Sequence, residues 1–142
     1  MNIDAAGLAF IEANEGYTPF PINDNGHPMW GYGHDRQAGE ATPTAGINHA
    51  DAETLLEKDL ATRFEPAVNQ LIPPECTQNQ YNALCDFAYN LGVTAFATMM
   101  HHGWDQVPLQ IPAWCWEHVD GVLQKSPGLE TRRAAEVALF NK

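Results

Sequence analysis

A dense run of prolines and glycines across residues 17–47 constrains the fold of this chain more than any other feature. Proline lacks a backbone donor and glycine weakens a helix, so this segment excludes a long helix. Asn25-Gly26 is a turn signal typical of a β-hairpin, and the alternation of aromatic residues with glycines at 30–34 predicts a short strand. We therefore expect a small, hairpin-rich lobe here. The breakers are Pro19, Pro21, Gly26, Pro28, Gly31, Gly33, Gly39, Pro43 and Gly46.

Apolar residues recur at helical spacing on both sides of that segment. The spacing predicts a first amphipathic helix over residues 3–14. A second apolar stripe runs from about residue 49 to Leu71, with a kink expected at Pro66. Thr77 and Gln80 form a capping-box pattern that opens a further helix, which ends at Gly92. Three more helices are expected at 94–102, 108–120 and 127–140. The chain is therefore predicted to be α+β, mainly α, and to form a single domain over 1–142.

Charge and composition make several classes of partner and ligand a poor fit for this chain. The net charge of −11 is a poor fit for nucleic acid and for anionic membrane surfaces, which basic faces usually bind. The first residues carry no basic start and acidic residues interrupt their apolar stretch, so we expect neither a signal peptide nor a membrane anchor. Three cysteines form no even framework and are expected to be free thiols. The paired histidines and the Cys115/His118 spacing supply too few ligands for zinc, so no metal is expected.

Two carboxylates flank the point where the first helix gives way to the breaker-rich loop. Glycosidases usually need a protonated acid for the leaving oxygen and a carboxylate across the scissile bond. Glu15 lies at the negative end of a helix dipole, and partial burial there also raises a carboxyl pKa. Asp24 lies nine residues on, in a polar loop. Glu15 is therefore the better acid and Asp24 the better permanent anion, although spacing alone is equally compatible with two solvated carboxylates.

The wider sequence resembles one family along nearly its whole length. The string NEGYTPFPINDNGHPMWGYGHD resembles the catalytic segment of phage-type lysozymes, glycoside hydrolase family 24. DAETLLEKDL resembles the family's lobe-connecting helix, TQNQYNALCDFAYNLG its central helix and GLETRRAAEVALF its C-terminal helix. The resemblance implies a lysozyme-like fold. It would have a first helix at 3–14, a small β-containing lobe at 15–47, and a connecting helix and helical lobe at 48–142.

The resemblance also implies an activity. The family cuts the β-1,4 bond between N-acetylmuramic acid and N-acetylglucosamine in peptidoglycan, without metal or organic cofactor. Its glutamate matches Glu15 and its aspartate matches Asp24, although a different gap would place Asn23 there. We expect a monomer that is made in the cytoplasm without a signal peptide and acts on the bacterial cell wall after release or delivery.

One position departs from the family pattern. Members usually carry threonine where this chain has Met29, and a thioether cannot donate a proton and accepts hydrogen bonds only weakly. Another polar group could substitute, with Asn23, Thr18 and His27 as candidates. Alternatively the enzyme could be a lytic transglycosylase, in which the muramic 6-hydroxyl replaces water. A third alternative is a weakly active or non-catalytic protein that binds wall glycan.

The remaining site residues follow from the same resemblance. The family pairs the histidine that matches His34 with an aspartate that matches Asp59, so we expect a structural ion pair. Arg132 matches an arginine that approaches the catalytic glutamate, and a surface arginine on the last helix is the alternative. The family's cleft-lining stretch matches Tyr89 and Asn90. Asn90 is the better substrate contact, whereas core packing suits Tyr89 equally well. Tyr32 could line the sugar groove or fill the small lobe.

Overall fold

The computed structural model describes residues 1–24 and 26–142, with the backbone alone described at Asp24. Helix α1 (Ala5–Glu15) begins where the Asp4 side chain accepts a hydrogen bond from the Gly7 amide, at 2.9 Å. An N-cap of this kind satisfies a donor that has no partner inside the helix. The helix ends at Gly16, whose φ of 72° leaves the helical region. Glu15 is thus the last residue of the helix.

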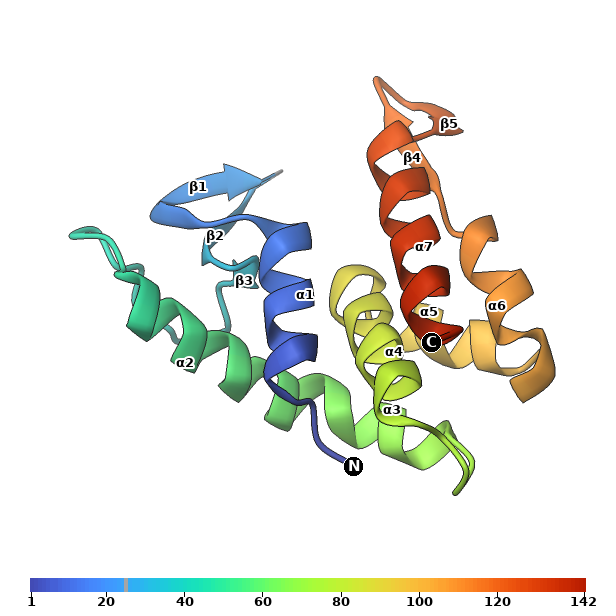
Figure 1. Cartoon of the computed structure of the whole chain (residues 1–142). Coiled ribbons are helices and arrows are strands. Elements are labelled where there is room, and N and C mark those ends of the chain that lie inside the picture. The colour runs from blue at the N-terminus through green and yellow to red at the C-terminus, as the bar shows by residue number, and fades with distance from the viewer. Residues whose placement is uncertain (25) are drawn as a thin grey trace.

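A three-stranded antiparallel sheet follows, in the order β1 (Thr18–Asp24), β2 (His27–Gly31), β3 (His34–Asp35). Its β1–β2 hairpin agrees with the predicted turn, although Asn25 itself lies outside the described residues. The continuous strand expected over 30–34 was wrong. Gly31 and Gly33 have φ values of 64° and 76°, so the chain turns between β2 and β3 instead of remaining extended. Figure 1 shows this sheet beside α1 and α2.

One long helical rod connects the sheet to the remaining helices (Figure 1). It comprises α2 (His49–Asp59), a π-helical segment (Leu60–Phe64) and α3 (Glu65–Leu71). Pro66 lies in the first turn of α3. Proline has no N–H for the carbonyl one turn earlier, which accounts for the irregular hydrogen bonding just before it. The distortion predicted at Pro66 is therefore present as a widened turn that precedes the proline.

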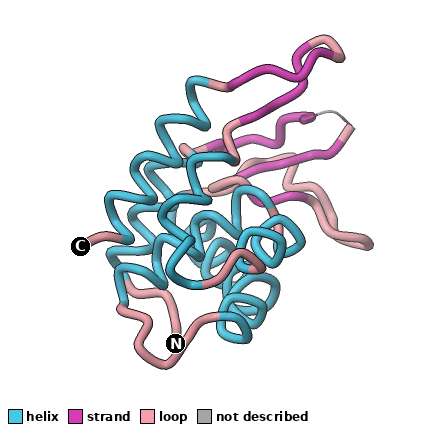
Figure 2. Tube along the Cα trace, turned by 90° about the vertical axis from the view of Figure 1, so that its right-hand side faces the viewer, coloured by secondary structure: helices cyan, strands magenta, loops and turns pink. Residues whose placement is uncertain are grey.

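Helix α4 (Gln78–Leu91) forms the centre of the helical half. Thr77 and Gln80 make both hydrogen bonds of a capping box, and Gly92 ends the helix. Every residue from Tyr81 to Ala88 is buried. A helix that is covered all round must have neighbours on each side, and α4 packs against α1, α3, α5 and α7. Figure 2 shows the helices gathered together, with the strands on one side of them.

The last third of the chain departs from the sequence prediction. After α5 (Val93–Met100) come α6 (Val107–Gln110) and a 3₁₀ turn, and then β4 (Trp116–Val119) and β5 (Val122–Lys125) form a hairpin. The helix expected over 108–120 was therefore wrong beyond residue 113. Asp120 and Gly121 both have positive φ, as a tight hairpin turn requires. Helix α7 (Pro127–Phe140) then packs along α4, and Ser126 caps it.

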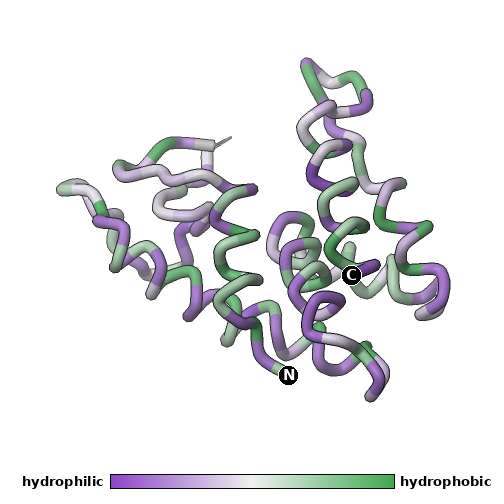
Figure 3. Tube along the Cα trace, viewed as in Figure 1, coloured by the Kyte–Doolittle hydropathy of each residue, from purple (hydrophilic) through white to green (hydrophobic). Residues whose placement is uncertain are grey.

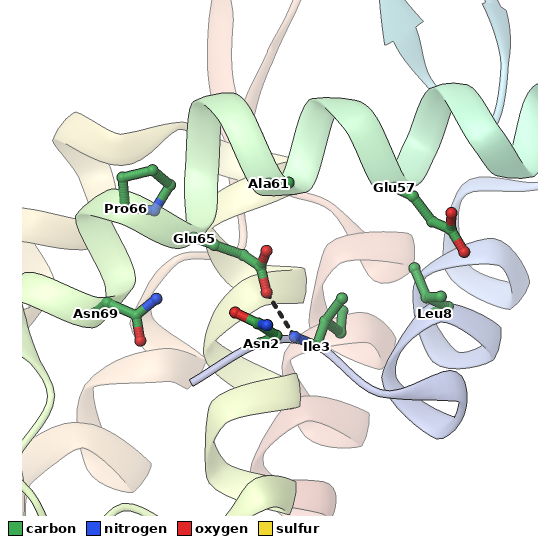
Figure 4. Close-up of a pocket in the computed structure, with 8 residues that line it drawn as sticks. All are labelled: Asn2, Ile3, Leu8, Glu57, Ala61, Glu65, Pro66 and Asn69. Carbon is green, nitrogen blue, oxygen red and sulfur yellow. Dashed lines mark hydrogen bonds between the residues drawn. The ribbon is translucent and has the colours of Figure 1, made fainter.

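The N-terminal residues are fastened to the connecting rod. Figure 4 shows the Glu65 carboxylate accepting a hydrogen bond from the Ile3 amide in a pocket beside α3. The Tyr81 hydroxyl donates to the same carboxylate from α4, at 3.1 Å. Glu65 thereby links the start of the chain, the rod and the central helix, which fixes the position from which α1 begins.

The fold is α+β and mainly α, with one core shared by the helices. All three cysteines, Cys76, Cys85 and Cys115, are buried and free. Figure 3 shows hydrophilic residues interrupting the hydrophobic ones along α2 and α7. Among the helices of the described chain, none combines the length and the apolar character needed to span a membrane.

Candidate active site

Glu15 occupies a pocket between the sheet and the central helix. The pocket has a volume of about 180 Å³, and the Glu15 side chain is 15% exposed. The end of α1, strands β2 and β3 and the end of α4 each contribute to its walls. Three parts of the chain that are distant in sequence therefore meet around one carboxyl group. The lining residues are Glu15, Met29, Gly33, Asp35, Tyr89 and Asn90.

Gly33 makes room for the Glu15 carboxyl group. A Cβ built at Gly33 would lie 2.6 Å from Glu15 Oε2, so a side chain there would push the carboxyl group out of its place. The φ of 76° at Gly33 also belongs to the left-handed region, where side chains are strained. The turn between β2 and β3 thus brings backbone directly against the acid, and only glycine permits this approach.

Arg132 holds the other side of Glu15. Its Nη2 atom lies 2.7 Å from Glu15 Oε1. Nη2 and Nε also donate to the two carboxylate oxygens of Asp86, at 2.8 and 3.0 Å. Asp86 is fully buried on α4. Its bidentate pair with Arg132 fixes the guanidinium group in the position from which it also contacts Glu15. The alternative of a surface arginine on the last helix is therefore wrong for Arg132, which is buried.

The pKa of Glu15 lies above its ordinary value. Burial of the carboxyl group is the largest cause, and the negative charges of Asp86 and Asp35 act in the same direction. Arg132 opposes them through its charge and its hydrogen bond. The balance favours the protonated form to higher pH than for a free glutamate, which is what a general acid requires.

A second buried arginine supports Asn90. Arg133 Nη2 donates to Asn90 Oδ1 at 2.9 Å and lies 2.6 Å from Glu136 Oε1. Burial is the main reason that the pKa of Glu136 is raised, with Asp86 contributing next. Asn90 therefore lines the pocket while Arg133 fixes its side-chain oxygen.

The two tyrosines predicted near the groove have different places. Tyr89 lines the pocket, and its hydroxyl donates to the Tyr32 carbonyl at 2.7 Å. The Tyr32 side chain is buried and bonds His49 Nδ1 at 3.0 Å, so it fills the small lobe. Tyr89 thereby ties the central helix to the turn that carries Gly33.

The candidates around Met29 are dispersed. Met29 itself lines the pocket. Asn23 pairs with Pro28 and Thr18 pairs with Gly31, and neither is among the described residues around Glu15. His27 lines a different recess, together with Arg36 and Gln37. The backbone of Asp24 pairs with that of His27 at the end of the hairpin, and its side chain lies outside the described part of the structure.

His34 lies behind the site between two carboxylates. It is 3% exposed, with Nδ1 2.5 Å from Asp59 and Nε2 2.8 Å from Glu40. Burial acts to lower the pKa of His34, but the hydrogen bonds to Asp59 and Glu40 outweigh it and raise the pKa. The imidazolium form thus joins β3 to α2 and to the loop that contains Glu40.

We expect this cluster to make stability depend on pH. Because the folded pKa of His34 is raised above 6.5, its contribution is fully present below that value and is lost as pH rises through the folded pKa. The folded pKa of Glu40 is lowered from 4.5, because contacts with Gln37 and His34 outweigh its burial. Its contribution is therefore lost as pH falls through the folded pKa.

Urea unfolding at intervals from about pH 2 to pH 9 would measure both slopes. In His34→Asn the loss of stability above pH 6.5 should flatten, whereas His118→Asn, on the exposed β4 strand, should retain it. A wild-type slope that persists in His34→Asn would exclude this source.

Several site residues escaped the sequence interpretation. Asp35 directly follows the glycine–histidine string, and no role was predicted for it. Asp86 lies one turn before the predicted contact Asn90 on the same core helix, and that spacing was a usable signal. Glu40, Arg133 and Glu136 carried no signal that separated them from surface charges. Within residues 1–24 and 26–142, no three His, Cys, Asp or Glu side chains are grouped so as to hold a metal ion.

A largely buried carboxyl group with a raised pKa, at the end of a helix and in a pocket between a small sheet and a helical half, is the arrangement expected of a glycoside hydrolase of the lysozyme class. Residues 12–136 match the phage lysozyme family. An endolysin of Acyrthosiphon pisum secondary endosymbiont phage 1 is 32% identical, over 99% of this chain and 98% of that protein. An endolysin of Bacillus phage PZA is 33% identical, over 99% of this chain and 55% of its own length.

Solved structures agree with this. The muramidase domain of SpmX from Asticaccaulis excentricus superposes with a TM-score of 0.87 at 30% identity, covering 99% of this chain and 98% of that one. The endolysin of Escherichia coli phage FAHEc1 gives 0.86 at 30% identity, covering 99% and 93%. The chain belongs to the phage lysozyme family, and it is a peptidoglycan-degrading hydrolase.

Proposed function

We propose that this lysozyme hydrolyses the β-1,4 bond between N-acetylmuramic acid and N-acetylglucosamine, with Glu15 as the general acid. The observation that carries the proposal is the Glu15 carboxyl group, which is largely buried, has a raised pKa and lines a pocket. In the protonated state it can donate to the leaving glycosidic oxygen. Arg132 then stabilises the carboxylate that remains, because its guanidinium group is already 2.7 Å away.

The other residues take supporting roles in the proposal. Asp24, close to the tip of the hairpin, supplies a negative charge for the positive charge that develops at the sugar C1 atom. Asn90 and Tyr89 line the pocket and can hydrogen-bond to sugar hydroxyl and acetamido groups. The substrate groove would run between a small lobe (15–47) and a helical lobe (48–142). No cofactor is needed for this chemistry.

Partners and location follow from the substrate. We propose that the chain acts as a monomer on the glycan strands of the bacterial wall and reaches them after release or delivery from the cytoplasm. The net charge of −11 favours neither nucleic acid nor anionic membrane as a partner.

Mass spectrometry of digested peptidoglycan tests the reaction. Hydrolysis adds one water per bond cut and leaves reducing N-acetylmuramic acid ends. A lytic transglycosylase, which the thioether of Met29 favours because it cannot orient water, would leave 1,6-anhydromuramic ends. We expect reducing ends. Anhydromuramic ends would instead assign transglycosylase activity. Peptidoglycan that binds the protein but stays undigested would indicate a glycan-binding protein without catalytic activity.

A further inference from the structure

We propose that Asp35 holds and deprotonates the water that attacks the sugar, the task that Met29 cannot perform. This inference rests on the proposed hydrolysis at Glu15 and names the group that completes it. Its basis is a juxtaposition: Met29 and Asp35 are cross-strand partners in the β2–β3 ladder, and both line the pocket of Glu15.

The register places the two side chains on the same face of the sheet. Directly opposed residues of an antiparallel pair have Cβ atoms about 4.5–5.5 Å apart. Ile22 of β1 is the partner of Met29 on its other side, so one row crosses the sheet from Ile22 through Met29 to Asp35. A carboxylate at the end of this row therefore lies within one side-chain length of the thioether.

The backbone around Asp35 is held firmly. The Arg36 amide donates to the Pro28 carbonyl at 3.0 Å, and Gln37 Nε2 donates to the Asp35 carbonyl at 2.6 Å. The preceding residue, His34, is clamped between Asp59 and Glu40. Asp35 thus projects from a fixed point, as a group that positions a water molecule must.

The carboxylate itself is available. The side chain of Asp35 is exposed, and no described residue forms a hydrogen bond or an ion pair with its carboxylate oxygens. Four other described acidic groups around the site do have partners: Glu15 and Asp86 bind Arg132, while Asp59 and Glu40 bind His34. A carboxylate at the wall of a pocket that no described residue binds can accept a hydrogen bond from water and take its proton.

The step balances with groups already present. Glu15 gives its proton to the glycosidic oxygen as the bond from that oxygen to C1 breaks. Water forms the new C1–O bond from the opposite face and passes a proton to Asp35. Solvent then removes that proton from Asp35 and returns one to Glu15, which restores the enzyme. The outcome is inversion at C1.

Asp35→Asn tests the assignment because it keeps the size of the side chain and removes the base. With a soluble peptidoglycan oligomer, we expect kcat to fall about 10²- to 10³-fold with KM changed less than threefold. In Asp35→Ala, added azide should restore turnover and yield an α-glycosyl azide, a product that a merely structural role of Asp35 cannot explain.

The control variants distinguish a failure of the role of Asp35 from a failure of the proposed hydrolysis. Asp105→Asn, on an exposed turn remote from the sheet, should leave kcat and its pH profile unchanged. If Asp35→Asn keeps activity within threefold of wild type while Glu15→Gln is inactive, the role of Asp35 is overturned. The proposed hydrolysis then remains intact. Anhydromuramic products would also overturn it, because no water attacks in that reaction. A wild-type protein that cuts nothing would overturn the hydrolysis and the role of Asp35 together.

Discussion

Replacing Glu15 with Gln should lower the release of soluble fragments from purified peptidoglycan roughly 10³- to 10⁴-fold, the upper part of the range for a general acid. Glutamine has the same shape and retains a hydrogen-bonding oxygen for Arg132, but it has no proton to give to the leaving oxygen. The same assay on the wild type should show activity falling as pH rises through the raised pKa of Glu15, because the acid form is lost there.

Glu12→Gln is the matched control for that variant. Glu12 is a partly buried glutamate one turn earlier on α1, and burial raises its pKa as well. It lies outside the residues that line the pocket of Glu15. We expect its activity to stay within about twofold of wild type. Appreciable lysis by folded Glu15→Gln, with the alkaline limb still present, would assign the acid to another residue.

Asp86→Ala should lower the free energy of unfolding by about 3–5 kcal/mol, because it leaves the buried guanidinium group of Arg132 without its bidentate partner. Asn14 would lose its contact with the same carboxylate, at 3.2 Å. Urea unfolding at pH 7 measures the loss. Asp105→Ala, with an exposed aspartate, should change stability by less than about 0.5 kcal/mol.

The same substitution should change catalysis in a defined direction. The negative charge of Asp86 helps to raise the pKa of Glu15, and Asp86 also competes with Glu15 for Arg132. Without Asp86 the pKa of Glu15 falls, so the alkaline limb of activity moves to lower pH. If Asp86→Ala lowers the free energy of unfolding by less than about 1 kcal/mol, or leaves the alkaline limb of activity at the same pH, Asp86 does not hold the arginine that Glu15 contacts.

Short sequence signals were enough to predict most of the helices and turns of the fold. The capping box at Thr77 and Gln80, the stop at Gly92 and the N-cap at Ser126 act through adjacent residues, so a pattern can find them. The β4–β5 hairpin was missed although Asp120-Gly121 is a strong turn signal. Apolar residues in that stretch also match helical spacing, and the preceding turns really are helical. The turn signal favours a hairpin in this stretch and the apolar spacing favours a helix. Local sequence does not decide between the two structures.

The site was only partly readable because its parts are joined across the sequence. Glu15 follows from its helix end and from the family resemblance. Asp86 and Arg132 are 46 residues apart, and nothing in either local pattern shows that they form a pair. Asp35 becomes prominent only when the turn at Gly33 folds β3 back on β2 and sets it opposite Met29. Register, and not residue type, makes that aspartate a neighbour of the acid.

Burial of the three sulfur atoms has a practical consequence for handling the protein outside a reducing environment. Oxidants attack the thiolate, and burial raises the pKa of Cys76 and Cys85 and so suppresses that form. Cys115 is 3% exposed. We therefore expect the folded protein to resist cross-linking through its cysteines in air, and to need no added reductant during purification.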